Sequence, residues 1–145
     1  PLLTAPTEGQ DIVADYRSIG LTLRRHPLAL LRERLGREHL IPLAELATLP
    51  DGSEVHTAGI VLTRQRPGTA SGVTFVTIED ETAHANLIVW ERVGDAQRRP
   101  LLESRLLEVH GRLQRQGVVT HLVARRLIDR SALLGSLAPR ARNFH

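Results

Sequence analysis

The side chains that could do chemistry in this 145-residue chain are histidines, carboxylates and arginines, because cysteine, methionine and lysine are all absent. Their absence excludes disulfides, thiolate zinc sites, cysteine nucleophiles and lysine Schiff bases. The seven histidines never stand in the His-x-x-x-His spacing that places two metal ligands on one helix face. No phosphate-binding P-loop and no Gly-x-Ser-x-Gly nucleophile elbow occurs. The sequence therefore predicts no catalytic constellation, no metal site and no cofactor in this chain.

One acidic cluster, Glu79-Asp80-Glu81, has the composition of a divalent-cation site. It falls, however, at a predicted tight turn between two strands, where carboxylates are ordinarily solvated. An aspartate at such a turn hydrogen-bonds the backbone of the turn itself. We therefore interpret Asp80 as a turn residue and not as a metal ligand.

All nineteen basic residues are arginine, against sixteen acidic residues, and the net charge is +3. Arginine binds phosphate through two parallel hydrogen bonds and stacks on bases, so this composition suits nucleic acid. Codon bias in a GC-rich genome would produce the same composition, and both explanations stay open here. The positive excess lies in the second half, because residues 1–52 hold six arginines against seven acids and residues 53–126 hold ten against eight.

The first third of the chain has helical signals. The length suits one domain with flanking segments. A capping box opens a first helix at Thr7, and apolar residues at helical spacing predict a second helix over 27–35 and a short third one over 42–49. The turn Pro50-Asp51-Gly52 ends this helical segment, residues 1–50, and marks the boundary of the next domain.

Beyond this turn the pattern alternates, which predicts five strands. A helical stretch over 91–102, interrupted by Pro100, separates the third strand from the fourth. The order strand, strand, strand, helix, strand, strand is that of the five-stranded Greek-key OB-fold barrel. The predicted class is mainly β with a helical flank: an OB-fold over 51–128 and a short helical and basic tail over 129–145. The predicted strands are 53–64, 73–80, 83–90, 105–115 and 118–127.

Alternation sends Phe75 and Thr77 to the face opposite Val76 and Ile78, and Asn86 to the same outward face of the next strand. The run Phe-Val-Thr-Ile-Glu-Asp that starts at Phe75 resembles the Phe-x-x-Leu-x-Asp pattern of anticodon-binding OB-folds in class II aminoacyl-tRNA synthetases and of OB modules in bacterial replicative polymerases. The resemblance implies that Phe75 stacks on a base and that Asn86 contacts a base edge beside Thr77. A core aromatic and a surface amide are the alternatives.

Arginines surround this predicted face. Arg64 and Arg66 lie where a long polar loop, residues 64–72, leaves the first strand, which suits phosphate contact. Arg112 and Arg115 approach the second hairpin, and Arg125 leaves the fifth strand. Base stacking is worth about 1–3 kcal/mol per base, and the chain has only four aromatic residues. We therefore expect DNA binding to be weak, salt-sensitive and non-specific.

Longer strings, taken in order, resemble the C-terminal OB region of the bacterial error-prone DNA polymerases, the damage-inducible paralogues of the polymerase III alpha subunit. Residues 15–28 are similar to the segment that precedes this region, and Arg142-Asn143-Phe144-His145 resembles the family's Ser-Arg-Asp-Phe-His ending. The similar strings in the barrel are Ala-Gly-Ile-Val-Leu-Thr-Arg-Gln-Arg-Pro-Gly at 58–68, Gly-Val-Thr-Phe-Val-Thr-Ile-Glu-Asp-Glu-Thr at 72–82 and Ala-Asn-Leu-Ile-Val-Trp at 85–90.

The resemblance implies a DNA-directed DNA polymerase of the C family that acts in translesion synthesis and DNA-damage-induced mutagenesis. The carboxylates that bind Mg²⁺ in such enzymes lie upstream of this region, so this chain itself is expected to be non-catalytic. It is expected to contact single-stranded template DNA. No apolar run reaches the 18–20 residues that a membrane span needs, and we expect a soluble, cytoplasmic protein.

The resemblance also implies protein partners: a catalytically inactive Y-family-like protein that binds the sliding clamp, and a small RecA-like accessory protein. The alternative function is therefore a docking module for such partners without DNA affinity, acting through the tail 139–145 or the loop 64–72. A tRNA anticodon-binding domain is a third reading, supported only by the pattern that starts at Phe75.

Overall fold

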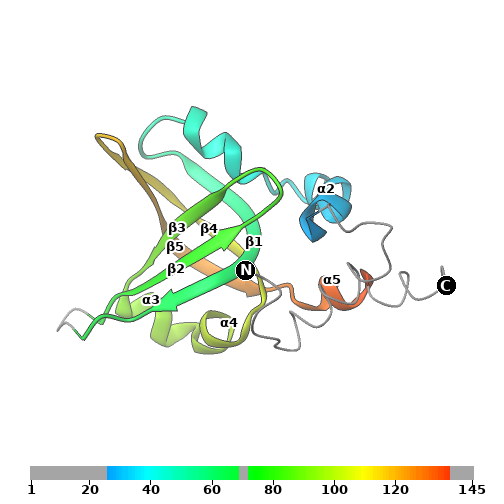
Figure 1. Cartoon of the computed structure of the whole chain (residues 1–145). Helices are drawn as coiled ribbons and strands as arrows, with labels where there is room; N and C mark the ends of the chain where they lie inside the picture. Colours follow the sequence, from blue (N-terminus) through cyan, green and yellow to red (C-terminus); the bar gives the residue numbers. More distant parts are fainter. Residues whose placement is uncertain (1–25, 69–71, 138–145) are drawn as a thin grey trace.

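A computed structural model describes residues 26–68 and 72–137 of the chain, and these form a closed five-stranded barrel (Figure 1). The order around the barrel is β1-β2-β3-β5-β4, and β4 pairs back to β1. Neighbouring strands are antiparallel except β3 and β5, which are parallel. The barrel predicted from the sequence is confirmed, with every strand within two residues of its expected bounds. The strands are β1 (Glu54–Gln65), β2 (Thr74–Glu79), β3 (His84–Val89), β4 (Leu106–Gln116) and β5 (Val119–Asp129).

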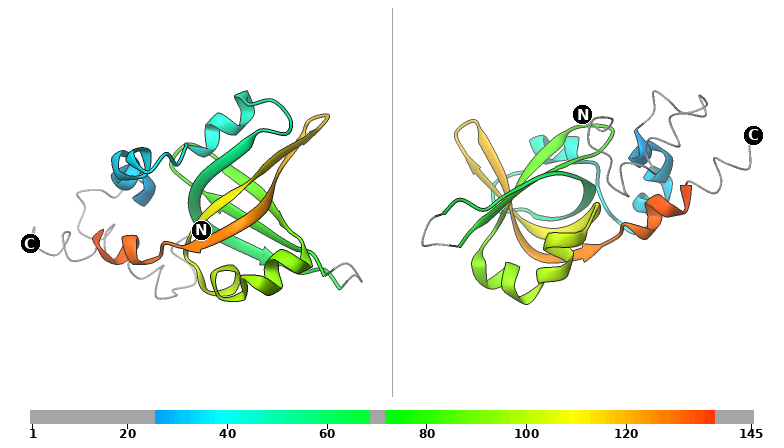
Figure 2. Two further views of the ribbon diagram at one scale, coloured as in Figure 1. Left: turned by 180° about the vertical axis from the view of Figure 1, so that it is seen from behind. Right: turned by 60° about the horizontal axis from the view of Figure 1, so that its bottom comes forward.

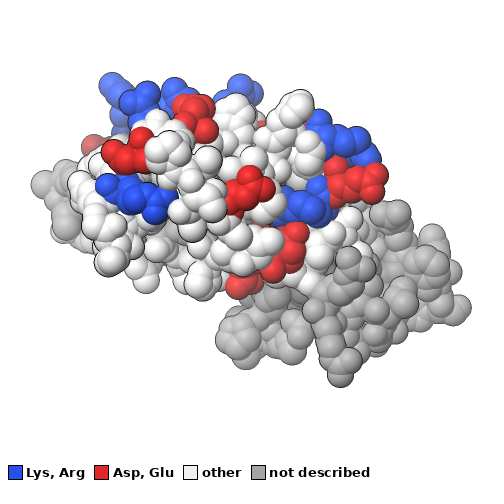
Figure 3. Space-filling model, turned by 90° about the horizontal axis from the view of Figure 1, so that it is seen from above, with Lys and Arg blue, Asp and Glu red and all other residues white. Residues whose placement is uncertain are grey.

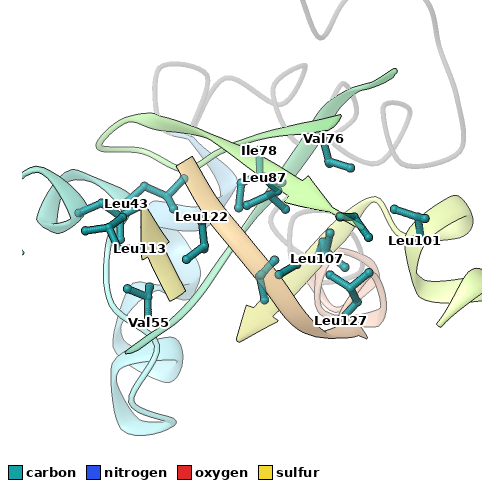
Figure 4. Close-up of a cluster of buried hydrophobic side chains, with 14 residues drawn as sticks. Leu43, Val55, Val76, Ile78, Leu87, Leu101, Leu107, Leu113, Leu122 and Leu127 are labelled. Carbon is teal, nitrogen blue, oxygen red and sulfur yellow. The ribbon is translucent and has the colours of Figure 1, made fainter. Parts of the chain in front are cut away.

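The barrel interior is filled by apolar side chains from alternating strand positions (Figure 4). Val76 and Ile78 of β2 and Leu87 of β3 are buried there, as alternation predicts. Burial of one such side chain contributes about 1.5–3 kcal/mol. A one-residue slip would turn all of them to solvent, so the strand register is strongly favoured. The interior residues from the five strands are Val55, Val76, Ile78, Leu87, Val89, Leu107, Val109, Leu113, Leu122, Ala124 and Leu127.

Two short helices, α3 (Glu91–Ala96) and α4 (Arg98–Glu103), cover the lower end of the barrel in Figure 1. The sequence predicts a single stretch broken at Pro100, but the break is at Gln97. Pro100 lies in the first turn of α4, where a missing N–H costs no hydrogen bond. The Gln97 side chain holds the break in place, because its Nε2 donates to the Arg125 carbonyl (2.9 Å) and its Oε1 accepts from the Leu127 N–H (2.7 Å).

A second apolar cluster lies outside the barrel, where α2 (Pro27–Arg37) and α5 (Ala132–Gly135) pack on the outer surface of β1 and β4 (Figure 2). Helix α2 confirms the predicted helix over 27–35 and is two residues longer. Its first residue is a proline, and the His26 ring caps it by accepting from the Leu28 N–H (3.0 Å). The cluster contains Leu28, Leu31, Leu35, Leu40, Ala58, Ile60, Leu106, Leu133, Leu134 and Leu137.

The buried carboxylate of Asp80 joins the β2–β3 turn to both flanking helical elements. Its Oδ1 accepts from the Thr82 and Ala83 N–H groups (2.7 and 3.0 Å), which confirms the predicted turn role. The expectation that this carboxylate is solvated is wrong, because Asp80 is only 3% exposed. Its Oδ2 accepts from the Leu43 N–H (2.8 Å) at the start of the 3₁₀ helix η1 (Leu43–Thr48), and from Arg32 of α2 (3.0 Å). The short helix expected over 42–49 is η1.

The helix that the sequence predicts from Thr7, and the tail 139–145, lie outside the described residues. Within 26–68 and 72–137, no helix has the length and apolarity needed to cross a membrane.

Candidate nucleic-acid interface

The outer face of β2 and β3 carries the three residues predicted to contact bases. Phe75 is 36% exposed and belongs to neither apolar cluster, so it is an outward aromatic and not a core one. It stands beside Ile88 of β3, and Thr77 stands beside Asn86. The Thr77 hydroxyl donates to Oδ1 of Asn86 (3.1 Å). Among the described residues the Asn86 amide nitrogen has no hydrogen-bond partner, so its two N–H groups are available to an acceptor on a base edge.

A continuous row of side chains extends from Phe75 across the barrel. Ile88 pairs with Val123 of β5, and Val123 pairs with Arg112 of β4. Ile88 is only 8% exposed although it points away from the barrel interior, because its outward neighbours cover it. The row therefore has an aromatic side chain at one end, an apolar middle and a cation at the other end. Its members in order are Phe75, Ile88, Val123 and Arg112, and Gln65 of β1 stands on the other side of Phe75.

A second row beside the first is polar and contains no acidic residue. Thr63 pairs with Thr77, which pairs with Asn86. His121 precedes Leu122, the parallel partner of Leu87, and therefore stands next to Asn86 on the outer face. The second row supplies hydrogen-bonding groups alongside the apolar one.

Arg112 and Arg125 meet at the β4–β5 end of these rows. They line a groove with Asp51, Gly52, Leu113, Gln114 and Val123. Arg125 donates to Oε2 of Glu54. Arg112 lies directly opposite Glu54 in the register of β1 and β4. Its guanidinium nevertheless makes no ion pair or hydrogen bond to any described residue. The structure thus brings two predicted arginines together in one groove, at the other end of the row from Phe75.

Arg64 and Arg115 serve the scaffold instead. Strand β1 continues to Gln65, so Arg64 belongs to the strand and not to the loop. Its Nε donates to the Leu101 carbonyl (2.6 Å) and its Nη2 to the Ser104 carbonyl, which holds the end of α4. Desolvation in this position lowers the pKa of the Arg64 guanidinium.

Arg115 has the same kind of role at the opposite end of the barrel. Its Nη2 donates to the carbonyls of Leu46 (2.9 Å) and Leu49 (2.7 Å), which terminate η1. Both arginines therefore donate to backbone carbonyl groups at the end of a helix.

Arg66 lies in a different hollow from the Arg112 groove. This hollow lies between the β1–β2 connection and α3–α4, and Arg66 forms an ion pair there with Glu91 (3.5 Å). Both partners are half-exposed, so the pair contributes little to stability. The hollow has mixed charge because its lining includes Arg64, Arg66, Glu91, Asp95 and Arg98.

Basic and acidic side chains alternate over the face of the molecule seen from above (Figure 3). Within the described ranges, no group of three or more histidine and acidic side chains is placed to hold a metal ion. Because the charges alternate on the face seen in Figure 3, electrostatic attraction to DNA on that face is local to individual arginines.

Residues 55–129 match the family described as the OB-fold nucleic acid binding domain, of the tRNA anti-codon type. The chain belongs to this family. The match begins one residue into β1 and ends with the last residue of β5, so the OB-fold domain corresponds to the barrel with its helices α3 and α4.

Relatives of this OB-fold domain are error-prone DNA polymerases. The chain is 58% identical over its whole length to that of Alkalilimnicola ehrlichii, and 54% identical over 99% of its length to that of Azoarcus sp.. It spans only 14% and 13% of those two proteins. The resemblance found in the sequence is therefore confirmed.

Among solved structures, the domain is similar to asparaginyl-tRNA synthetase from Pyrococcus horikoshii. The TM-score is 0.52 at 21% identity, with 61% of this chain and 22% of the synthetase covered. The complex of that synthetase with asparaginyl-adenylate gives a TM-score of 0.53 at 20% identity, over 63% and 22% of the two chains. Identity at this level shows that the fold is shared.

Several residues on the outer face that carries the two rows could not be predicted from the sequence alone. Val123 and Glu54 join it through strand pairing between segments distant in the chain, which alternation within one strand does not reveal, whereas alternation already places Ile88 on the same face as Asn86. The stack of His56 on His110, with ring centroids 3.9 Å apart, arises in the same way because these residues pair across β1 and β4. Alternation in the fourth and fifth strands indicates that Val123 faces outward, but it does not identify the strand beside it.

Proposed function

We propose that this OB-fold domain is a non-catalytic part of an error-prone DNA polymerase and binds single-stranded template DNA during translesion synthesis and DNA-damage-induced mutagenesis. The observation that carries the proposal is the cross-strand row with Phe75 at one end and Arg112 at the other. Bases stack on an exposed aromatic ring, and a guanidinium binds the phosphate that follows. The error-prone polymerase relatives support the choice of DNA as the ligand.

The geometry supports weak binding. Phe75 is the aromatic ring of the row, and one stacked base contributes about 1–3 kcal/mol. Arg112 and Arg125 offer at most two phosphate contacts, for which the logarithm of the binding constant should fall with the logarithm of salt concentration with a slope no steeper than about −1.4. Between 50 and 200 mM salt the affinity should then drop at most about sevenfold. Such binding would hold a template strand that the rest of the polymerase positions.

The template path across the row follows from strand spacing. From Phe75 on β2 to Arg112 on β4 the row crosses three strand-to-strand steps, through Ile88 and Val123. At about 4.8 Å per step the path along the curved barrel wall is about 14 Å. A few nucleotides fill that length, so the strand would run across the β-strands and not along them.

Fluorescence anisotropy of a labelled oligothymidylate of about 20 nucleotides, titrated with the chain at 50 and 200 mM salt, tests the proposal. Phe75→Ala should weaken binding about fivefold or more, because the stacking contribution is lost. Leu102→Ala is the matched control, since Leu102 is an exposed apolar residue of α4 (50%) outside the row. Arg64 is unsuitable as a test residue because its loss would disturb the end of α4.

Two other outcomes would indicate a different function or a different DNA-binding surface. If the folded chain binds no DNA at either salt concentration, the proposal is wrong, and docking of the inactive Y-family-like protein or the RecA-like accessory protein becomes the function to test. If Phe75→Ala and Leu102→Ala bind as the unsubstituted chain does, DNA binds elsewhere on the domain. The Mg²⁺-dependent catalysis expected of the whole polymerase is assigned by this proposal to residues outside the chain.

A further inference from the structure

We propose that Glu54 limits the affinity of the Arg112–Arg125 groove for DNA phosphate, because it holds Arg125 in an ion pair that an incoming phosphate must displace. The inference rests on the proposed function and names the residue that sets its strength. Glu54 is thus a carboxylate that competes with the ligand at one end of the row.

The position of Glu54 follows from the strand register. It is the first residue of β1 and stands directly opposite Arg112 on β4. Its Oε2 accepts from Nη2 of Arg125 and lies 3.5 Å from Nε2 of His56. The side chains of Arg125 and Glu54 are 58% and 43% exposed, so water and solutes reach the pair. An ion pair this exposed can be exchanged for another partner at small cost.

Among the residues that the structure describes, four charged side chains lie at the groove. Arg112 and Arg125 are the cations, and Glu54 and Asp51 are the carboxylates. Asp51 is already engaged, because its Oδ1 accepts from the backbone N–H of Arg115 (2.7 Å). The groove is therefore close to neutral with Glu54 in place, and it gains one positive charge when Glu54 is neutralised.

The two arginines differ in their readiness to bind an anion. Arg112 makes no ion pair to a described residue and can contact a phosphate at once. A phosphate reaches Arg125 only by replacing Glu54, because a guanidinium binds carboxylate and phosphate in the same two-bond geometry. Glu54 opposes binding in two ways: it occupies Arg125 and it repels the incoming anion.

Glu54→Gln removes the negative charge and keeps the size of the side chain. We expect oligothymidylate to bind this variant about two- to fivefold more tightly at 50 mM salt, which corresponds to the strength of an exposed ion pair. The salt dependence should steepen, because Arg125 then contributes a full phosphate contact.

The matched control is Glu103→Gln, which changes the net charge by the same amount. Glu103 pairs with Arg99 on α4 (3.6 Å), and neither residue lines the groove. The double variant Glu54→Gln/Arg125→Ala should lose the gain, because the arginine that Glu54 releases is then missing. Anisotropy with the same labelled strand measures all of these variants on the full chain.

Each result distinguishes the inference about Glu54 from the proposed function of the domain. Equal tightening by Glu54→Gln and Glu103→Gln would overturn the inference, since net charge alone would explain it. A chain that binds DNA through Phe75 while Glu54→Gln binds no more tightly would also overturn the inference and leave the proposed function standing. No binding by the unsubstituted chain or by Glu54→Gln would overturn the proposed function itself.

Discussion

Replacement of Asp80 by asparagine should destabilise the fold strongly, because one buried carboxylate serves three structural elements. Asp80 is 3% exposed, and its Oδ2 accepts from the Leu43 N–H (2.8 Å) and from Arg32 (3.0 Å). An amide group placed there presents N–H groups to two donors. The Oδ1 contacts to the Thr82 and Ala83 N–H groups survive the change, since the amide keeps one oxygen.

The magnitude follows from the two bonds that are lost. A hydrogen bond to a charged group contributes about 1.5–3 kcal/mol, so two of them give about 3–6 kcal/mol. The loss should not exceed this range, because Arg32 keeps Glu81 as a partner at 2.8 Å. A loss of 3 kcal/mol lowers the melting temperature of a domain of this size by about 10 °C.

Urea denaturation followed by circular dichroism measures this free energy of unfolding. Asp95→Asn is the matched control, because Asp95 is an exposed residue of α3 and should change stability by less than about 0.5 kcal/mol. A loss below about 1 kcal/mol for Asp80→Asn would refute the reasoning. It would mean that α2 and η1 hold to the barrel by apolar packing alone.

Two further substitutions test the backbone and the surface charges. Gly111→Ala should cost about 2–3 kcal/mol in urea denaturation, because its Cβ would lie 2.3 Å from the Val123 carbonyl oxygen; Gly36→Ala, with open space around it, should not destabilise. Hydrogen bonding to Arg130 lowers the pKa of Glu38 in the folded chain. The ionised Glu38 carboxylate therefore stabilises the fold above the unfolded pKa of about 4.3, and this stabilisation is lost as the pH falls through the lower folded pKa. Glu38→Gln should therefore be less stable at pH 7 by under about 1 kcal/mol and no less stable near pH 2, and an equal difference at both pH values would contradict the assignment.

Local rules in the sequence account for most of the barrel. Alternation places Val76 and Phe75 on opposite faces, and the structure has Val76 inside the barrel and Phe75 outside. Turn chemistry places Asp80 at a turn, and the carboxylate does bind that turn. These features depend on residues close together in the chain, where the periodicity and the turn propensities act directly.

The roles of the arginines could not be predicted in the same way. Arg64 and Arg112 look alike in the sequence, yet one binds two carbonyls at the end of α4 and the other makes no ion pair within the described residues. The difference depends on where a helix ends next to a strand some forty residues away. The position of the helix break at Gln97 could not be predicted from the sequence either, because it depends on hydrogen bonds to β5.

Strand β1, together with β4, separates the two apolar clusters and contributes side chains to both. Val55 points into the barrel, while Ala58 and Ile60 point outward under α2 and α5. Loss of β1 from its neighbours would open both clusters at once. The barrel and the described flanking helices should consequently unfold as one cooperative unit, and the amide protons of β1 should be among the last to exchange with solvent.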